Sequence, residues 1–356
     1  MNQAVKAKLQ LAVSMLIFSS IGIVRKFIPM PSSVIAFARG LIGMLFLLLV
    51  VLVTKNVISF KNIKKNLAIL LLSGAAIGFN WIFLFEAYNN TSIAISTLSY
   101  YMAPFFVMIL SPVFLKEKLT RKKIFCLAGA LTGMVFVSGI INNGIPALNE
   151  IKGILFGLAA AALYASVIIL NKKLGEISAY DKTIVQLGSA ALVVLPYCCL
   201  TVKPSQLTFS TEAVIMIVVA GIVHTGIAYV MYFNSMKDLK AQTIAIFSYI
   251  DPAVAVLLSV FLLKEGMDIY GVIGAVLILG SAFASEVNLK KIIIKEKNNK
   301  YNFQYVISFL IPFVGFIIGA IMLTKDDEKK LECGKTCICI SILSIIIYGL
   351  ILFLIF

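Results

Sequence analysis

Residues 101–117 read YMAPFFVMILSPVFLKE, and residues 249–265 read YIDPAVAVLLSVFLLKE. The tyrosine, the first proline, a serine and the closing Leu-Lys-Glu recur at a constant offset of 148 residues. Two residues upstream recur at the same offset, Gly78 as Gly226 and Phe85 as Phe233. The chain is therefore an internal duplication. Duplicated membrane-length segments are typical of transporters whose two halves enclose a substrate near the bilayer midplane.

The composition indicates that the solvent of this fold is lipid. Hydrophobic residues make up 61% of the chain and charged residues 13%, and the mean hydropathy is +1.02. A water-soluble globule has a lower apolar share and a higher charged share. Apolar runs of about 20 residues predict twelve membrane helices. We expect them near 9–29, 33–54, 66–88, 92–115, 122–141, 152–171, 183–202, 211–235, 241–263, 268–286, 303–323 and 337–356.

The basic residues predict the orientation of the chain in the membrane. With the N-terminus in the cytoplasm, 21 of the 31 Lys and Arg residues fall on the cytoplasmic side and 9 on the outer side. This bias follows the positive-inside rule and predicts a multi-pass protein of the cell membrane. The formal charge of +15 then needs no nucleic-acid partner to explain it.

The repeat predicts how the chain is divided. Because each copy holds an odd number of predicted helices, the second copy enters the membrane from the opposite side, so the halves are inverted. We expect an all-α membrane protein with ten helices in two inverted five-helix repeats and two further C-terminal helices. The predicted parts are a first repeat over 1–141, a second over 142–286, a basic cytoplasmic linker over 287–302 and a two-helix module of unassigned role over 303–356.

The repeated segments resemble the drug/metabolite transporter superfamily, most closely its EamA-type ten-helix branch. The residues that carry the resemblance are Ala103-Pro104 through Glu117 with Gly129 and Gly133, and Asp251-Pro252 through Glu265 with Gly274 and Gly280. It covers about residues 9–286. The resemblance implies a transporter rather than an enzyme, but the family carries many kinds of solute. Asp251 stands where the second half of family members usually has Glu.

Two ionisable residues are expected near the middle of the membrane. Asp251 precedes Pro252, whose ring leaves a backbone carbonyl one turn earlier without its helical donor, which favours a proton, cation or ammonium site. The alternative is a structural carboxyl at a helix kink. His224 is the one histidine of the chain. It is either a substrate partner or proton carrier, or a packing residue with a satisfied ring.

Arg39 and Glu86 are expected near the outer ends of the second and third helices. A guanidinium is well suited to hold a carboxylate, so the two residues form either an outer gate or a clamp for an anionic substrate group. The alternatives are a permanent structural ion pair and snorkelling to the headgroups.

Polar-tipped side chains, Tyr229 and Tyr232 among them, gather at the predicted midplane depth and favour a central pocket of mixed character. Together with the two ionisable residues above, the predicted substrate-binding set is Asn80, Trp81, Tyr100, Tyr101, His224, Tyr249 and Asp251. Pro104 and Pro252 are the predicted helix-breaking, flexible points.

No motif for enzymatic chemistry was found, and no metal or cofactor is expected. The spacing of Cys333, Cys337 and Cys339 does not match a zinc site, which leaves free thiols or a Cys333–Cys337 bond. The leading prediction is a secondary transporter of a small organic metabolite, an amino acid or related solute, with export favoured and proton coupling a candidate. The alternatives are a cationic drug/proton antiporter and a non-transporting scaffold or sensor. A homodimer stays open.

Overall fold

The structure of the chain is a computed structural model. It describes residues 3–55, 57–91, 93–137, 141, 151–263, 269–286, 302–310, 312–323, 330–331, 333–338 and 340–341. The chain divides into two compact units, residues 1–286 and residues 287–356. The described elements are helices, as the composition predicted.

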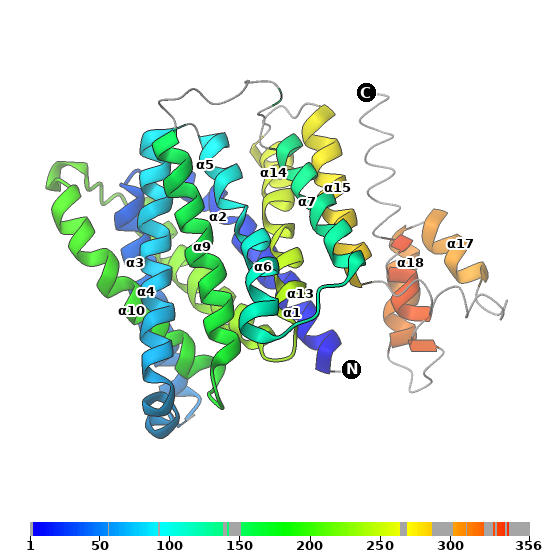
Figure 1. Cartoon of the computed structure of the whole chain (residues 1–356), viewed down its shortest axis with the longest axis horizontal. Helices are drawn as coiled ribbons and strands as arrows, with labels where there is room; N and C mark the ends of the chain where they lie inside the picture. The colour runs from blue at the N-terminus through cyan, green and yellow to red at the C-terminus, as the bar shows by residue number, and fades with distance from the viewer. Residues whose placement is uncertain are drawn as a thin grey trace. The chain divides into compact units, whose positions relative to one another are not determined.

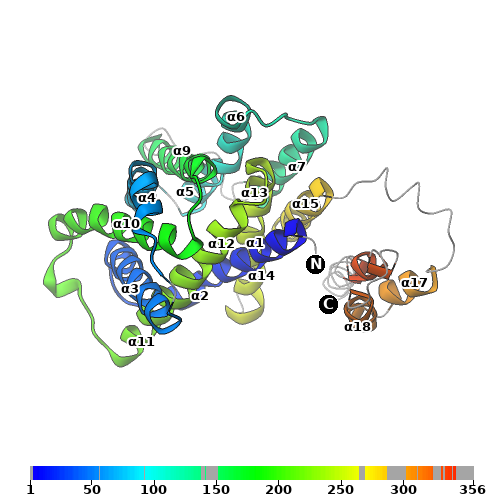
Figure 2. The same ribbon diagram turned by 90° about the horizontal axis from the view of Figure 1, so that it is seen from below.

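The first unit is a bundle of helices that cross it from end to end (Figures 1 and 2). Its first half contains α1 (Gln3–Ser19), α2 (Ile21–Lys26), α3 (Ser32–Val53), α4 (Phe60–Asn90), α5 (Ile93–Tyr100), α6 (Ala103–Leu115) and α7 (Arg121–Val137). Its second half contains α9 (Ile151–Lys173), α10 (Ala179–Thr201), the 3-10 turn η2 (Pro204–Gln206), α11 (Thr211–Gly221), the π-helix η3 (Ile222–Ile227), α12 (Ala228–Met236), α13 (Ala241–Ser248), α14 (Ile250–Leu263) and α15 (Ile269–Glu286).

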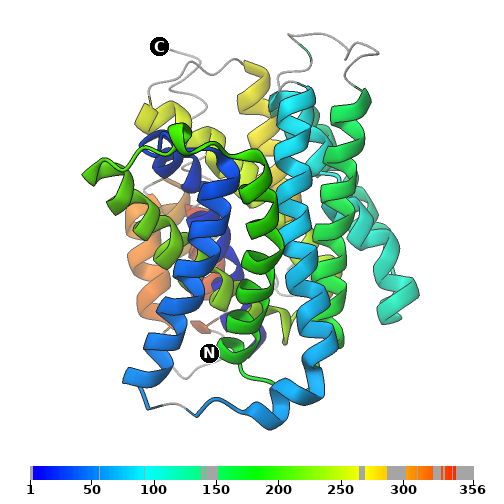
Figure 3. The same cartoon turned by 90° about the vertical axis from the view of Figure 1, so that its left-hand side faces the viewer.

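Corresponding helices of the two halves run in opposite directions. In Figure 1, α5 and α6 descend through the bundle, whereas their counterparts α13 and α14 ascend. Helix α4 rises from Phe60 to Asn90, which Figure 3 shows from another side. The halves interleave, because α1 packs against α12 and α14, α4 against α9 and α10, and α7 against α15.

Both halves break a membrane-length segment at the same place in the repeat. The segment predicted over 92–115 is two helices, α5 and α6, and the segment over 241–263 is α13 and α14. Each break falls just before the repeated proline, Pro104 or Pro252. Proline has no backbone N–H and disfavours helical geometry in the residue before it, so the chain restarts a helix with the proline in its first turn.

Seven helices of the described part of the chain are long and apolar enough to cross a membrane. They are Gln3–Lys26, Ser32–Val53, Phe60–Asn90, Ile95–Leu115, Ile151–Lys173, Ala179–Thr201 and Thr211–Met236. An all-helical membrane protein is thus confirmed, but a count of twelve spanning helices is not. The predicted helix over 337–356 lies mostly outside the described residues.

The second unit departs from the expected single helix over 303–323. Helices α17 (Asn302–Leu310) and α18 (Pro312–Leu323) occupy this range and pack on each other. Pro312 begins α18, in keeping with the preference of proline for the first helical position. The Sγ atoms of Cys333 and Cys337 lie 3.9 Å apart as free thiols, so the alternative of a bond between them is wrong.

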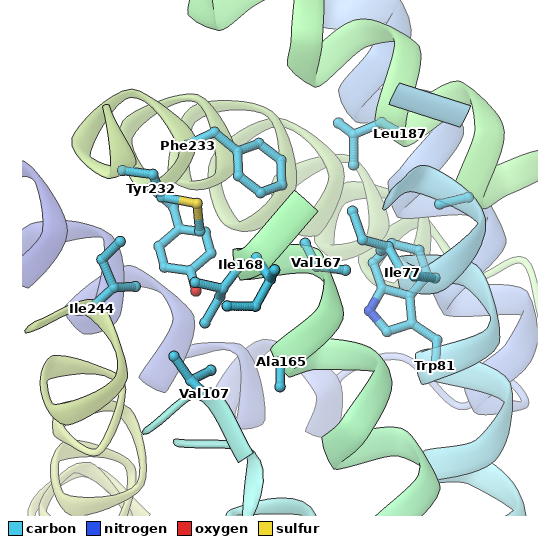
Figure 4. Close-up of a cluster of buried hydrophobic side chains, with 14 of the residues drawn as sticks. Ile77, Trp81, Val107, Ala165, Val167, Ile168, Leu187, Tyr232, Phe233 and Ile244 are labelled. Atoms are coloured by element: carbon cyan, nitrogen blue, oxygen red, sulfur yellow. The ribbon is translucent and has the colours of Figure 1, made fainter. Parts of the chain in front are cut away.

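The main core of the first unit lies where α4, α9, α10, α12 and α13 meet. Figure 4 shows this cluster, with Ile77 and Trp81 from α4 facing Ile168 from α9 and Phe233 from α12. Helices α4 and α10 come close because Gly74 faces the backbone: an added Cβ there would lie 2.6 Å from the carbonyl oxygen of Gln186. Small residues at helix contacts are the usual device for close packing in lipid.

Candidate substrate pocket

A cavity of about 570 Å³ lies inside the first unit. Its walls come from both halves, from α1 to α6 in the first and from α9, η3, α12, α13 and α14 in the second. The lining includes Arg25, Ile28 and Ser32, so the cavity extends to the end of the bundle where α2 turns into α3. The volume is in the range of sites for small organic ligands.

The cavity is lined by equivalent positions of the two repeats. Four pairs at the repeat offset both contribute to its wall: Trp81 and Tyr229, Leu84 and Tyr232, Tyr100 and Ser248, and Ala103 and Asp251. A cavity formed by repeat-related surfaces lies at the interface of the two halves. The last pair is also where the halves differ most in charge, because Asp251 brings a carboxyl where the first half has the methyl group of Ala103.

Asp251 occupies the first turn of α14 and lines the cavity. The Tyr101 hydroxyl, at the break between α5 and α6, lies next to its carboxyl group. Among the described residues, no basic side chain forms an ion pair with Asp251. Asp251 is also the one acidic side chain among the described residues of the cavity wall.

Arg39 projects from α3 into the same cavity. Its guanidinium carbon lies 4.8 Å from the centre of the Trp81 ring, within the range of a cation–π contact. The Tyr229 side chain lies beside both of these residues. The Arg39 Nε atom is buried and has no hydrogen-bond partner.

Glu86 takes another partner than the one the sequence suggested. The Tyr197 hydroxyl on α10 donates to Glu86 Oε1 at 2.5 Å, and Glu86 does not line the cavity. Within the described residues, no ion pair joins Arg39 to Glu86. Arg39 therefore contacts the Trp81 ring and the Tyr229 side chain but has no carboxylate partner among the described residues.

His224 lies in the π-helix η3 and faces α1 and α2 across the cavity wall. Its Nε2 atom is 2.9 Å from Ser20 Oγ, and Ser20 Oγ donates its hydrogen to the carbonyl oxygen of Ile17 at 2.8 Å. The Ser20 hydroxyl therefore lies between the His224 ring and the carbonyl oxygen of Ile17 and can hydrogen-bond to both. His224 thus links the second half to the first helical segment of the chain.

The predicted site residues divide into those that line the cavity and those that do not. The cavity brings together Arg39, Trp81, Tyr100, Tyr101, Pro104, His224 and Asp251. Asn80, Tyr249, Glu86 and Pro252 do not line it. Asn80 donates to the carbonyl oxygen of Ala160 at 2.6 Å, and the Tyr249 hydroxyl donates to the carbonyl oxygen of Tyr101 at 3.0 Å. This second bond joins the two repeated tyrosines across the halves.

The predicted set missed several residues of the wall. Tyr164 on α9 contributes its hydroxyl, which lies 2.6 Å from the hydroxyl of Tyr232 and 3.4 Å from Ser248 Oγ. Tyr229 and Tyr232, two of the polar-tipped aromatics expected at midplane depth, do line the cavity, as the repeat counterparts of Trp81 and Leu84. Arg25 looked like a flanking loop cation, and nothing in the sequence distinguished Tyr164 from a lipid-facing tyrosine.

The end of the bundle away from the α2–α3 turn is braced around the short turn between α12 and α13. Glu117 accepts hydrogen bonds from the backbone N–H groups of Ala241 at 2.8 Å and Gln242 at 3.3 Å. Lys172 Nζ donates to the carbonyl oxygens of Met236 at 2.8 Å and Leu239 at 2.7 Å. An acid at a helix N-terminus and a base at a helix C-terminus both match the helix dipole.

Comparisons with known proteins agree with this architecture. The chain is 32% identical over 279 residues to an uncharacterized transporter, YxxF, of Bacillus subtilis, covering 78% of this chain and 88% of that protein. It is 27% identical over 194 residues to an uncharacterized transporter of Archaeoglobus fulgidus, covering 54% and 67%. A crystal structure of a protein with 20% sequence identity superposes with a TM-score of 0.70, covering 80% of this chain and 98% of that one, which supports the fold alone.

The sequence profile of the EamA-like transporter family matches twice, at residues 6–139 and at residues 151–285. The two matches correspond to the two halves found from the 148-residue offset. Together with the multi-pass helical fold and the cavity between the halves, they show that the chain belongs to the EamA-like transporter family and is a membrane transporter, not an enzyme.

Proposed function

We propose that the chain is a secondary carrier that moves a small organic metabolite, such as an amino acid or a related solute, across the cytoplasmic membrane by alternating access. The observation that carries the proposal is the cavity lined by four pairs of repeat-related positions. A site bounded by equivalent surfaces of two antiparallel halves can open to either end when one half rocks against the other.

The two ends of the bundle differ in a way that supports one state of this cycle. The cavity reaches Arg25 and Ser32 at the α2–α3 turn, whereas Glu117 and Lys172 brace the opposite end. With the N-terminus in the cytoplasm, as the basic residues predict, the cavity opens outward and the brace closes the inner side. The family resemblance favours export as the physiological direction.

A cationic drug/proton antiporter is the second candidate, and Asp251 is the observation that favours it. Helices α1 and α2 contain no acidic residue, so Asp251 would have to serve both the proton and the cation. A non-transporting scaffold or sensor is the third candidate and predicts no solute movement.

Transport by purified protein in liposomes separates these candidates. We expect counterflow of one or more solutes from a panel of amino acids, other metabolites and cationic dyes, and an increase in flux under an imposed pH gradient. Asp251→Asn is expected to abolish the stimulation by the gradient. Asp181→Asn is the matched control, because Asp181 is also buried but lies outside the cavity, where its Oδ2 accepts from the Ser59 N–H at 3.4 Å.

Each other outcome has a definite meaning. If Asp251→Asn kept the flux and its pH dependence, Asp251 would have no part in coupling. Counterflow of dyes alone would favour the antiporter. A complete absence of counterflow across the panel would contradict the carrier proposal and favour a scaffold.

A further inference from the structure

We propose that Arg39 and Asp251 are the two poles of one binding site, which takes a zwitterionic solute: Arg39 binds its carboxylate and Asp251 its ammonium group. This inference rests on the proposed carrier function and specifies the substrate class of the same cavity. It follows from the surroundings of the two charged groups, from the lack of an ion pair between them, and from the aromatic side chains that line the same cavity.

The positive pole is a guanidinium whose Nε–H has no partner, while the Tyr229 side chain lies within hydrogen-bonding reach of the group. The Trp81 ring lies against Arg39 at 4.8 Å, and the Nε–H is buried without an acceptor. A buried N–H without a partner costs free energy, and a charged group costs more. Because Glu86 is held by Tyr197, the described residues supply no carboxylate to Arg39. A ligand carboxylate would fit the planar fork of the guanidinium.

The negative pole is a carboxyl group that lacks a cation. Asp251 lines the cavity, and the Tyr101 hydroxyl lies beside its carboxyl group. An ammonium group brings three N–H donors and a positive charge. It would satisfy this carboxylate in a way that an apolar or purely anionic solute cannot.

The two poles do not neutralise each other. Arg39 and Asp251 line the same cavity but form no ion pair, and the Tyr229 side chain lies within electrostatic range of both. Opposite charges in a low-dielectric site attract strongly unless something holds them apart. A solute with both charges satisfies both poles, whereas a simple cation or a simple anion leaves one of them uncompensated.

The rest of the cavity wall suits an apolar body. Trp81, Tyr100 and Tyr229 present ring surfaces to the cavity, and Phe18 and Phe85 add further apolar area. Their rings are held by neighbouring contacts, such as the edge-to-face contact between Phe18 and Tyr229 at 5.1 Å. The inferred solute is therefore an amino acid with an apolar side chain or a compound with the same arrangement of charges.

Arg25 provides a matched comparison for Arg39. Both arginines line the cavity, but Arg25 Nη1 donates to the carbonyl oxygen of Ile28 at 2.9 Å, near the mouth. Its guanidinium therefore already has a partner at the α2–α3 turn. If the carboxylate is bound by Arg39 and not by any arginine of the cavity, removal of Arg25 should leave the preference for a carboxylate intact.

The test measures binding of matched triplets to the full-length protein in lipid nanodiscs. Each triplet consists of a parent amino acid and two derivatives of it, and the parents are leucine, methionine and phenylalanine. One derivative is the amide, which lacks the carboxylate. The other is the N-acetyl derivative, which lacks the ammonium group. For the triplet that binds best, the wild type should bind the parent about tenfold or more tighter than either derivative, as expected for one charge-assisted contact.

The variants assign each preference to a residue. Arg39→Gln should bring the parent and the amide to equal affinity while the preference over the N-acetyl derivative stays. Asp251→Asn should bring the parent and the N-acetyl derivative to equal affinity while the preference over the amide stays. Arg25→Gln and Asp181→Asn should keep both preferences. If Arg39→Gln fails to fold, Arg39→Lys is used; it keeps the charge but not the fork, and should weaken the parent more than the amide.

Three results would overturn the inference. One is equal or tighter binding of the amides by the wild type, which would indicate a cation site. Another is an unchanged preference in both pole variants. The third is a lack of binding for every triplet, which overturns the zwitterion inference even if the broader panel shows counterflow of another solute. Triplet preferences without counterflow would instead keep the site and contradict the carrier function, so the two failures are distinguishable.

Discussion

Several single residues in this bundle contact partners that are far away in the sequence. His224 looked like a lone imidazole on an apolar helix, and its ring is held by Ser20, 204 residues earlier. That bond ties the π-helix η3 to the start of the chain. π-Helical turns often occur at functional sites, and this one places His224 at the cavity wall.

The bond between Ser20 and His224 can be tested by a double-mutant cycle. Ser20→Ala and His224→Gln should each lower the thermal stability of the purified protein. Because they remove the same hydrogen bond, the double variant should lose less than the sum, by about 1 kcal/mol. Ser166→Ala serves as the control, since that hydroxyl donates to its own helix at Ala162. Full additivity of Ser20→Ala and His224→Gln would contradict the bond.

At the scale of helices, the repeat explains why the same span is broken in both halves. The breaks before Pro104 and Pro252 create α5 with α6 and α13 with α14, and the tyrosines at the breaks meet through the Tyr249 hydroxyl and the Tyr101 carbonyl oxygen. The N-terminus of α13 has its own cap. Glu117, which follows α6 in the first half, accepts from the first two N–H groups of this helix in the second half.

Loss of this cap should loosen α13. Glu117→Gln removes the negative charge at the helix N-terminus, which should cost about 1 kcal/mol. Hydrogen exchange at the amides of residues 241–244 should become several times faster, and the effect should be confined to that end of the bundle. Glu176→Gln is the control, because Glu176 is exposed in the turn between α9 and α10. Exchange rates equal to those of the wild type would show that Glu117 does not hold α13.

The whole molecule is arranged around the antiparallel relation of its halves. Two turns with two lysines each, 116–120 after α6 and 237–240 after α12, lie at the end of the bundle where the chain begins. The turn after α10, with Lys203, lies at the opposite end. This distribution of loops agrees with the orientation that the charge bias predicts.

Labelling from outside intact cells tests that orientation. In a variant with all six cysteines replaced, Lys203→Cys should react with a membrane-impermeant thiol reagent. Lys118→Cys should react only after the cells are permeabilised. Both residues are exposed, so accessibility within the fold does not limit either reaction. Labelling of both positions from the same side would contradict the arrangement of the bundle in the membrane.

Much of this architecture could be predicted from the amino-acid pattern because lipid imposes strong rules on a chain. Apolar length and the constant offset of 148 residues were enough to locate the helices of the first unit and the two halves. The same rules drew attention to Arg39, His224 and Asp251, since an ionisable group in a membrane helix is costly unless it has a partner or a function. These features depend only on composition and on spacing along the chain.

Side-chain partners could not be predicted in the same way, because they depend on how each helix is rotated and which neighbour it packs against. Glu86 pairs with Tyr197 instead of Arg39, and Asn80 is used by the carbonyl oxygen of Ala160. The packed bundle was needed to show that Arg39 keeps a free donor and that Asp251 shares its cavity without pairing with it. Contacts between residues a hundred positions apart are set by three-dimensional packing, and periodicity along the chain carries no information about them.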